Sequence, residues 1–297
     1  MKDLAIVLVG LNARDFVLDC LRSIEEAGWR EVSYEVIYVD NGSRDGSAEA
    51  VADQFPAVRL VANDSNLGYC PAANQGARLS DARYYYFIND DTLVVDDALA
   101  LLVEYADQTD KLGTVGSRLV YPDGSEQYSG RRFPRFWASV FGRRSWLTRL
   151  LPGVAPVQDY LCTRELAAGE PFDVDWVSAA GQLVPRDAFW DVGGFAEDYY
   201  YWHEAVFCDR LTRRGLRVVL HPDSRVIHYE GKGSGPRPPK VQRFHITNFH
   251  QGAFRAYCER YSLGRLSPTY WLVGAALLAR ATLLYAGTFL PRARSSA

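Results

Sequence analysis

Short apolar runs alternate with segments of helical periodicity along the first third of the chain. Continuous apolar runs of four to six residues are typical of strands covered on both faces, and they occur at Leu4–Val9, Val36–Val39 and Tyr84–Ile88, while Val58–Val61 predicts a further short strand. The residues between them predict helices, one with Phe16, Cys20, Leu21 and Ile24 on one face, one over Ala48–Gln54 and one over Ala72–Leu79. This alternation predicts an α/β fold with a mostly parallel central sheet flanked by helices.

The pattern changes after Tyr121. Residues 121–171 are basic, rich in Pro and Gly and weakly periodic, which predicts a long functional loop with short helices. Regular structure resumes over 172–184, followed by a helix with Phe189 and Trp190 and a helix that ends near Gly215. Val218–Leu220 and Arg225–His228 predict two short edge strands.

The C-terminal segment Tyr270–Leu290 is almost entirely apolar, with Arg280 in its middle. It is long enough to span a bilayer, but a central Arg disfavours insertion by roughly 2.5–3.5 kcal/mol. We therefore expect a helix that lies at a membrane surface, with the Arg280 head in water and Trp271 and Tyr285 near the headgroups. Packing against the rest of the chain or a second subunit is the alternative.

Composition narrows the functional classes. A formal net charge of −3 gives no basic footprint for a nucleic-acid partner. Five scattered cysteines without a CxxC pair argue against a disulfide framework or a zinc site and favour a reducing compartment. Leu4–Val9 is too short for a signal peptide, so the sequence predicts a cytoplasmic protein.

Acidic residues follow two of the predicted strands. Asn89-Asp90-Asp91-Thr92 ends one strand, and its oxygens suit Mg²⁺ or Mn²⁺ with a diphosphate, Asp91 being the expected direct ligand. Asp40, in Asp40-Asn41-Gly42-Ser43, can accept a hydrogen bond from a pyrimidine N–H or a ribose hydroxyl. The alternative for both is a capping or turn motif. No GxGxxG follows the first strand, which argues against a dinucleotide oxidoreductase.

Six segments, taken together, resemble glycosyltransferase family 2, in particular its rhamnosyltransferase-like bacterial members. In order they are Tyr38–Ser47, Asn66–Gly76, Phe87–Thr92, Asp175–Gly181, Val192–Arg210 and His228–Ser234. The resemblance covers about residues 3–235 and implies a GT-A fold over 1–235. Its nucleotide-sugar-binding half would be 1–120 and its acceptor-binding half 121–235, with a C-terminal helical, membrane-associated extension over 236–297.

The resemblance also implies residue roles. Asp91 and His228 would bind the metal, although His228 can equally contact phosphate or bridge strands as a structural histidine. Arg131 and Arg132 would contact phosphate or remain solvated loop charges. Asp175 and Trp176 would line the cleft between donor and acceptor. The residues that bind the nucleotide sugar would be Asn12, Asp40, Asn41, Asn66, Gly68, Asn74, Asn89, Asp90, Asp175 and Trp176.

One segment departs from the family pattern Tyr-Trp-Glu-Asp-x-Asp-Leu-Cys. This chain reads Tyr201-Trp202-His203-Glu204-Ala205-Val206-Phe207-Cys208, which puts Glu204 at the position of the catalytic base. A Glu is an adequate general base, and His203 would orient it or act as the base itself. The alternative is that this helix start has lost its catalytic role.

The sequence therefore predicts an inverting, metal-dependent transferase that moves a sugar from a dTDP- or UDP-sugar to a hydroxyl of a glycan or lipid-linked acceptor. Rhamnose or a related hexose is the sugar that the resemblance favours. We expect the protein at the inner face of the membrane, held through 270–290. A non-catalytic nucleotide-sugar-binding protein is one alternative. A nucleotidyltransferase is the other, but it would normally carry a Gly-rich, basic loop that Gly10–Arg14 lacks.

Overall fold

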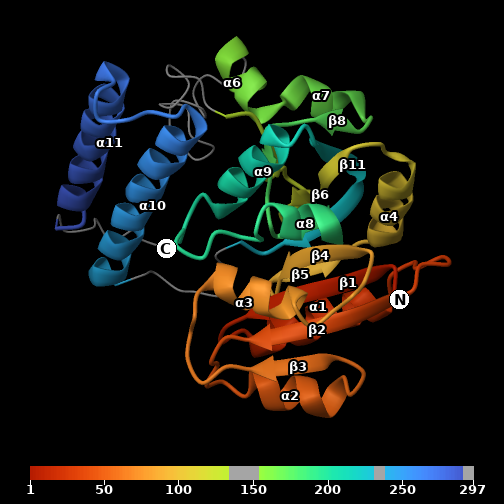
Figure 1. Cartoon of the computed structure of the whole chain (residues 1–297). Helices are drawn as coiled ribbons and strands as arrows, with labels where there is room; N and C mark the ends of the chain where they lie inside the picture. Colours follow the sequence, from red (N-terminus) through yellow and green to blue (C-terminus); the bar gives the residue numbers. More distant parts are fainter. Residues whose placement is uncertain (134–153, 231–237, 290–297) are drawn as a thin grey trace.

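The structure is a computed structural model that describes residues 1–133, 154–230 and 238–289. Residues 134–153 of the predicted loop, 231–234 of the last motif and Leu290 lie outside the described residues. The chain forms one large central sheet with helices on both faces and a pair of long C-terminal helices beside it (Figure 1).

The N-terminal part of the sheet is parallel and follows the predicted strands. Its order is β3-β2-β1-β4, and in register Gly10 at the end of β1 lies beside Asp40 at the end of β2. These strands and their intervening helices are β1 (Leu4–Gly10), α1 (Arg14–Glu25), β2 (Tyr34–Asp40), α2 (Ser47–Gln54), β3 (Arg59–Ala62), α3 (Tyr69–Ala77) and β4 (Tyr84–Asn89). Parallel strands bring their carboxyl ends to one edge, so the loops after β1, β2 and β4 meet there.

The rest of the sheet is mixed. From β4 the order continues β10-β6-β11-β5, with β10 antiparallel to both of its neighbours and β8 pairing with β11. The strands are β5 (Thr92–Val94), β6 (Leu112–Val120), β8 (Phe172–Asp173), β10 (Gly181–Pro185) and β11 (Arg217–His228), and β7 (Gly130–Arg131) pairs with β9 (Trp176–Val177) in a second, small sheet. Strands from 1–120 and 121–235 thus share one sheet, and the division into two halves stays a functional proposal.

The prediction of two short edge strands over Val218–Leu220 and Arg225–His228 was wrong. Both segments belong to β11, which lies inside the sheet between β6 and β5. The register of β11 against β6 shifts between His221 and Arg225, which accommodates the polar sequence that separates the two apolar runs.

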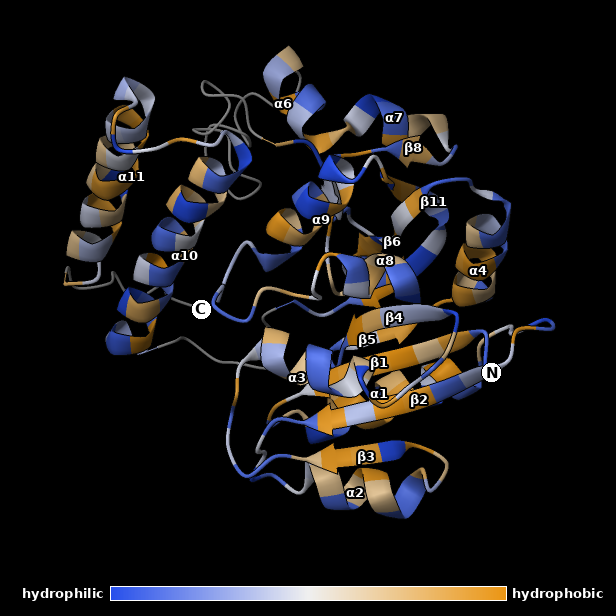
Figure 2. Cartoon of the chain, in the orientation of Figure 1, coloured by the Kyte–Doolittle hydropathy of each residue, from blue (hydrophilic) through white to orange (hydrophobic). Residues whose placement is uncertain are grey.

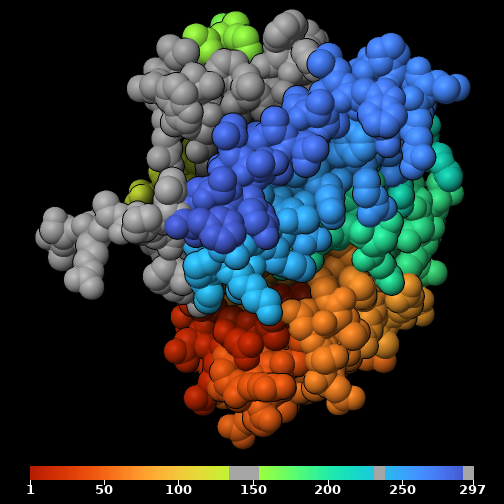
Figure 3. All heavy atoms as spheres, turned by 90° about the vertical axis from the view of Figure 1, so that its left-hand side faces the viewer, coloured from red at the N-terminus to blue at the C-terminus, as the bar shows by residue number. Residues whose placement is uncertain are grey.

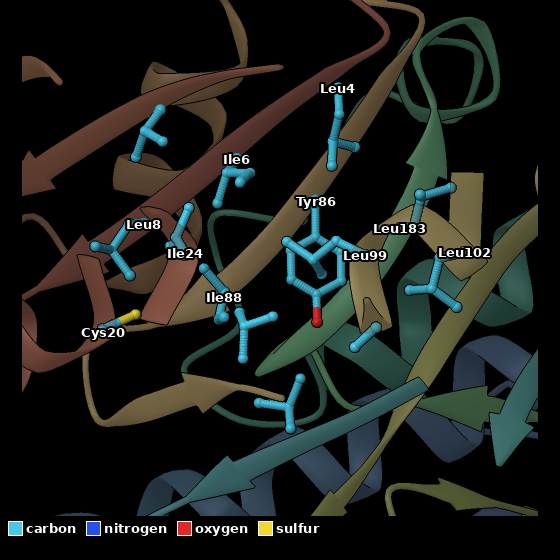
Figure 4. Close-up of a cluster of buried hydrophobic side chains, with 14 of the residues drawn as sticks. Leu4, Ile6, Leu8, Cys20, Ile24, Tyr86, Ile88, Leu99, Leu102 and Leu183 are labelled. Atoms are coloured by element: carbon cyan, nitrogen blue, oxygen red, sulfur yellow. The ribbon is translucent and has the colours of Figure 1, made fainter. Parts of the chain in front are cut away.

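Two apolar layers hold the helices on the sheet. One lies under α1, α2 and α4 (Ala98–Gln108), and Figure 4 shows Leu8, Ile24, Tyr86, Leu99 and Leu183 among its side chains. The other lies under α3, α8 (Arg186–Asp191) and α9 (His203–Arg213). Burial of these layers is the main stabilising term of the fold, at roughly 25 cal/mol per Å² of apolar area. Strand β1 accordingly appears largely orange in Figure 2.

Four further helices complete the described part of the chain. They are α6 (Ala155–Leu161) and α7 (Thr163–Ala168), followed at the C-terminus by α10 (Pro239–Arg260) and α11 (Pro268–Gly287). The sequence analysis missed α10, whose polar and apolar residues show little periodicity. The predicted apolar helix over 270–290 is confirmed as α11. Within the described residues α11 is the one helix long and apolar enough to cross a membrane, and Val273 is its one buried residue.

Candidate active site

The loops after β1 and β2 are joined by hydrogen bonds at the carboxyl end of the sheet. The Asn12 amide N–H donates to Ser43 Oγ (2.8 Å), and Asn12 Oδ1 accepts from the amide of Arg44 (2.8 Å). Asp40, buried at the end of β2, accepts from the Ser43 amide (2.9 Å) and from the Tyr38 hydroxyl (3.1 Å). These bonds fix the Asp40 carboxylate beneath the loops that follow β1 and β2.

Asn41 links the loop after β2 to the start of α3. Its Nδ2 donates to Asn66 Oδ1 and to the Gly68 carbonyl, both at 3.1 Å, and its Oδ1 accepts from the Leu67 amide (3.0 Å). Gly68 has φ +92°, a backbone conformation that favours glycine, and it directly precedes Tyr69 at the start of α3. The predicted residues Asn41, Asn66 and Gly68 therefore form one bonded group.

Asp90 lies between the first loop and the end of β4. Its Oδ2 accepts from the Leu11 amide (3.1 Å), and a Cβ at Gly10 would come within 2.7 Å of that oxygen. Burial, reinforced by the neighbouring charges of Asp91 and Asp40, raises the pKa of Asp90 to about 7. Three carboxylates therefore gather at the ends of β2 and β4, as the sequence predicted.

Asp91 is paired with His228, the last residue of β11. The Oδ1 atom of Asp91 lies 3.2 Å from His228 Nε2, and both side chains are largely buried. The other ring nitrogen, Nδ1, donates to Gln127 Oε1 (2.9 Å), while Gln127 Nε2 donates to the His228 carbonyl (2.6 Å). Because that second bond fixes which way the Gln127 amide points, Oε1 faces Nδ1, which therefore carries a hydrogen, and Nε2 is the ring nitrogen that faces Asp91.

The Asp91–His228 pair fits one edge of a divalent-cation site. A carboxylate oxygen and an imidazole nitrogen are ligands that Mg²⁺ or Mn²⁺ takes together with phosphate oxygens. Within the described residues no group of three or more His, Cys, Asp or Glu could hold a metal ion. Two protein ligands leave the remaining coordination positions for a diphosphate and water.

Glu204 lies in the first turn of α9, close to the start of α3. Its Oε2 is 3.5 Å from His203 Nδ1, and the His203 ring lies 5.1 Å from the ring of Tyr69. Burial and then the Glu204 charge raise the pKa of Tyr69 well above its usual range. The side chain of Glu204 is 21% exposed, so the carboxylate remains accessible beside this apolar surface.

The residue before α9 has a strained backbone and packs on the predicted cleft residue Trp176. Trp202 has φ +71°, unusual for a side chain of this size, and its ring lies 6.3 Å from that of Trp176. The Arg131 guanidinium stacks 3.8 Å above the Trp176 ring, and Asp175 accepts from the Phe133 amide (2.6 Å). The buried Trp176 Nε1 makes no hydrogen bond within the described residues, which leaves a donor for a ligand.

The side chain of Asn74 bonds to the turn that precedes α9. Its Nδ2 donates to the Phe195 carbonyl (2.8 Å) and to Glu197 Oε1 (3.0 Å), and its Oδ1 accepts from the Phe195 amide (3.0 Å). These bonds join α3 to the turn before α9, which contains Gly194 at φ +71°. The structure thus places Asn74 where it aligns the two helices, and its predicted contact with the sugar stays a prediction.

Two functional candidates were missed by the sequence analysis. Gln127, which follows β6 in the chain, contacts His228, and Tyr69 follows Gly68 and lies beside His203. Tyr69 lies within the segment Asn66–Gly76, but its partner His203 is far away in the chain. Gln127 precedes Arg131 and Arg132 in a basic segment, and no local pattern distinguishes it from its neighbours.

The chain is similar in sequence to known glycosyltransferases. The profile of "Glycosyl transferase family 2" matches residues 5–161. The N-acetylglucosaminyl-diphospho-decaprenol L-rhamnosyltransferase of Mycobacterium tuberculosis is 29% identical over 89% of this chain and 87% of its own length. The O-antigen biosynthesis protein RfbC of Myxococcus xanthus is 29% identical over 71% of this chain and 16% of its own length.

Two solved structures share the fold. A mannosyltransferase from Pyrobaculum calidifontis, solved with GDP-Man and Mn²⁺, has a TM-score of 0.60 and 18% identity over 97% of this chain and 73% of its own. GalNAc-T7, solved with UDP, GalNAc and Mn²⁺, has a TM-score of 0.62 and 15% identity over 95% of this chain and 55% of its own. The predicted GT-A-like α/β fold is thereby confirmed.

Proposed function

The chain belongs to glycosyl transferase family 2, and from that membership we propose that it transfers rhamnose from a dTDP- or UDP-sugar to a hydroxyl of a lipid-linked glycan, with inversion. Glycosyl transfer itself follows from the family and from the rhamnosyltransferase that is similar over most of the chain. The observation that carries the finer proposal is the Asp91–His228 pair, placed at the same sheet edge as Asp40 and Asp90.

In this proposal the nucleoside is held by the joined loops after β1 and β2. Asp40 and Asn41 are fixed by backbone and side-chain bonds, so they can present oxygen and nitrogen atoms to the base and ribose without rearrangement. Asn12, Asn66 and Gly68 shape the same surface through their bonds to Ser43 and Asn41. Preorganisation of this kind lowers the cost of binding.

Asp91 and His228 would hold Mg²⁺ or Mn²⁺, and the cation would neutralise the charge that develops on the departing diphosphate. The matching structural neighbours, solved with Mn²⁺, are consistent with this choice. Gln127 keeps His228 in the tautomer that leaves Nε2 available. The role of the protein at this end is positioning and charge stabilisation.

Glu204 is the proposed base. Its carboxylate takes the proton of the acceptor hydroxyl as that oxygen bonds to the anomeric carbon, while the bond from that carbon to the diphosphate oxygen breaks and its electron pair leaves with the diphosphate. His203, 3.5 Å from Glu204, orients the carboxylate. The indole N–H of Trp176 is available to the acceptor or the sugar, with Asp175 fixing the adjacent backbone.

A lipid-linked acceptor and a location at the membrane surface are supported by the same two observations. The similar mycobacterial protein is named for a decaprenol-linked substrate, and α11 exposes apolar side chains along its length. We place the protein at the inner face of the membrane, with α11 lying at the surface and Arg280 directed to the headgroups.

A panel of nucleotide sugars tests this function. Release of nucleoside diphosphate is measured for dTDP-rhamnose, UDP-sugars and GDP-sugars, with Mn²⁺ and with chelator, for the wild type and for Asp91→Ala and Glu204→Gln. We expect metal-dependent release from dTDP-rhamnose or a UDP-sugar that both substitutions abolish. Nucleotide binding without release from any donor would indicate a non-catalytic binding protein. Release unchanged in both variants would show that the site is elsewhere.

A further inference from the structure

One face of helix α10 contacts residues 199–202, the segment directly before α9. The Trp202 indole donates to the Phe249 carbonyl (3.1 Å), and the Tyr201 hydroxyl lies 2.7 Å from His245 Nδ1. Glu259, near the end of α10, bonds to Arg210 of α9 (3.1 Å) and to the Tyr199 hydroxyl (3.1 Å). The residues directly before Glu204 are therefore held by α10.

The other face of α10 forms a groove with α11. The groove has a volume of about 560 Å³ and is lined mainly by apolar side chains, among them Ile246, Phe254, Leu277, Leu278, Ala281 and Phe289. A volume in this range suits a small-molecule or lipid-chain ligand. Figure 3 shows α10 and α11 side by side on the surface, next to the N-terminal half of the molecule.

The surface of α11 beside the groove is also apolar. Leu278 is 68% exposed and Leu283 is 75% exposed, and Trp271 and Tyr285 add aromatic rings with polar groups. Exposed apolar side chains on this scale mark an interaction surface. Because the groove opens onto that surface, a hydrocarbon chain can pass from a bilayer into it without crossing polar protein.

Arg243 and Arg280 lie beside the groove, and within the described residues neither forms an ion pair with an acid. Arg280 donates to His250 Nε2 (2.8 Å), and His250 Nδ1 donates to the Ile246 carbonyl (2.7 Å), so the partner of Arg280 is a neutral ring. Arg243 stacks on Phe289 at 3.7 Å. Residues 239–297 contain eight Lys and Arg and one acidic residue, Glu259, which is already bonded to α9. Arg255 and Arg260 pair with Asp198 and Asp209, so Arg243 and Arg280 are the two cations at the groove that an anion can complement.

We propose that the α10–α11 groove is the site for the hydrocarbon chain of the lipid-linked acceptor, with its phosphate beside Arg280 and Arg243. The apolar lining matches an isoprenoid or acyl chain, and the unpaired cations match the phosphate that joins such a chain to a sugar. This inference rests on the proposed function for the identity of the acceptor. In this arrangement α10 lies between the lipid and the segment that contains Trp202 and Glu204.

The test measures binding and needs no turnover. Farnesyl phosphate and inorganic phosphate are titrated into the full-length protein by calorimetry, without donor, for the wild type, for Ala281→Trp, which fills the groove, and for Ala279→Trp, which adds the same side chain to the opposite face of α11. We expect farnesyl phosphate to bind the wild type and Ala279→Trp equally and Ala281→Trp at least tenfold more weakly. Inorganic phosphate alone should bind none of them measurably.

Two further measurements separate the alternatives. Leu278→Glu, at an exposed groove position, should weaken farnesyl phosphate binding as Ala281→Trp does, and Arg280→Gln should weaken farnesyl phosphate at least fivefold but leave farnesol unchanged. Equal farnesyl phosphate affinity in the wild type, Ala281→Trp and Leu278→Glu would overturn the proposal. So would a dimer, seen by sedimentation, that Ala281→Trp dissociates and farnesyl phosphate does not. Absent sugar transfer would contradict the proposed function while leaving this binding result intact.

Discussion

His228 presents its Nε2 to the Asp91 carboxylate at 3.2 Å from the end of a different strand. The contact follows from the sheet, because His228 in β11 pairs with Thr92 in β5, next to Asp91. Asp91 and His228, which are far apart in the sequence, thus lie together at the edge of the sheet where the diphosphate is proposed to bind. Gln127 determines which ring nitrogen faces Asp91.

The first prediction concerns Gln127. Gln127→Ala removes the acceptor for His228 Nδ1–H, so the ring loses its fixed tautomer and orientation, and we expect Mn²⁺ affinity to fall about 10- to 100-fold. Free Mn²⁺ is measured by electron paramagnetic resonance with the nucleoside diphosphate present. Gln54→Ala, at the exposed end of α2, is the control and should bind Mn²⁺ as the wild type does. Unchanged affinity in Gln127→Ala would show that His228 is not a ligand.

The second prediction concerns the base. Glu204→Gln keeps the shape of the side chain but accepts no proton, so kcat should fall by roughly 10²- to 10⁴-fold while donor affinity stays within about twofold. Single-turnover transfer and nucleotide titration measure the two quantities. The control Glu26→Gln changes an exposed carboxylate after α1 and should leave both unchanged. A Glu204→Gln enzyme with a normal kcat would leave His203 as the candidate, to be examined through His203→Gln.

Most of the N-terminal half of the fold could be predicted because β1, β4 and the centre of β2 are continuous apolar runs. Leu4–Val9 and Tyr84–Ile88 lie almost entirely within β1 and β4, and the acids after β2 and β4 then meet by the geometry of a parallel sheet. β11 was predicted as two strands because polar residues interrupt its apolar pattern, and only its pairing with β6 shows that the strand continues.

Contacts between distant segments could not be predicted in this way. Gln127 and Tyr69 owe their places to partners that one sequence does not reveal, namely His228 and His203. Helix α10 contacts Tyr201 and Trp202 with one face and α11 with the other. Apolar or aromatic side chains lie on both faces, so no single apolar stripe reveals the helical period.

The third prediction concerns stability and pH, at the end of the sheet opposite to the site. Asp3 accepts from the Ser33 hydroxyl (2.6 Å) and amide (3.0 Å) and from Arg83 (2.9 Å), and these bonds, led by the Ser33 hydroxyl, lower the pKa of Asp3 to about 2. Since the folded pKa lies below the unfolded value of 3.8, the stabilisation is complete above that value and is lost as pH falls through about 2.

Asp3→Asn should therefore lower the free energy of unfolding by about 1 kcal/mol at pH 7, and the difference from the wild type should shrink between pH 4 and pH 2. Thermal unfolding at pH 7, 5 and 3 measures it. Asp53→Asn, at an exposed position of α2, should show no such pH-dependent difference. A constant difference at all three values would mean that the charge of Asp3 does not contribute.

The last prediction concerns the contact between α10 and the residues before the base. A Cβ at Gly252 would lie 2.9 Å from the Tyr201 carbonyl oxygen and 3.2 Å from Trp202 Cδ1, so Gly252→Ala must push α10 away from this segment. We expect a stability loss of about 1–3 kcal/mol and a kcat at least tenfold lower, because Trp202 directly precedes the helix that carries Glu204. Mn²⁺ affinity should be unchanged, since the contacts that fix Asp91 and His228 are with each other and with Gln127. Gly264→Ala is the matched control, because nothing lies within 4 Å of its Cβ, and it should keep the wild-type kcat. A Gly252→Ala enzyme that loses stability but keeps its kcat would show that α10 supports the fold without positioning the base.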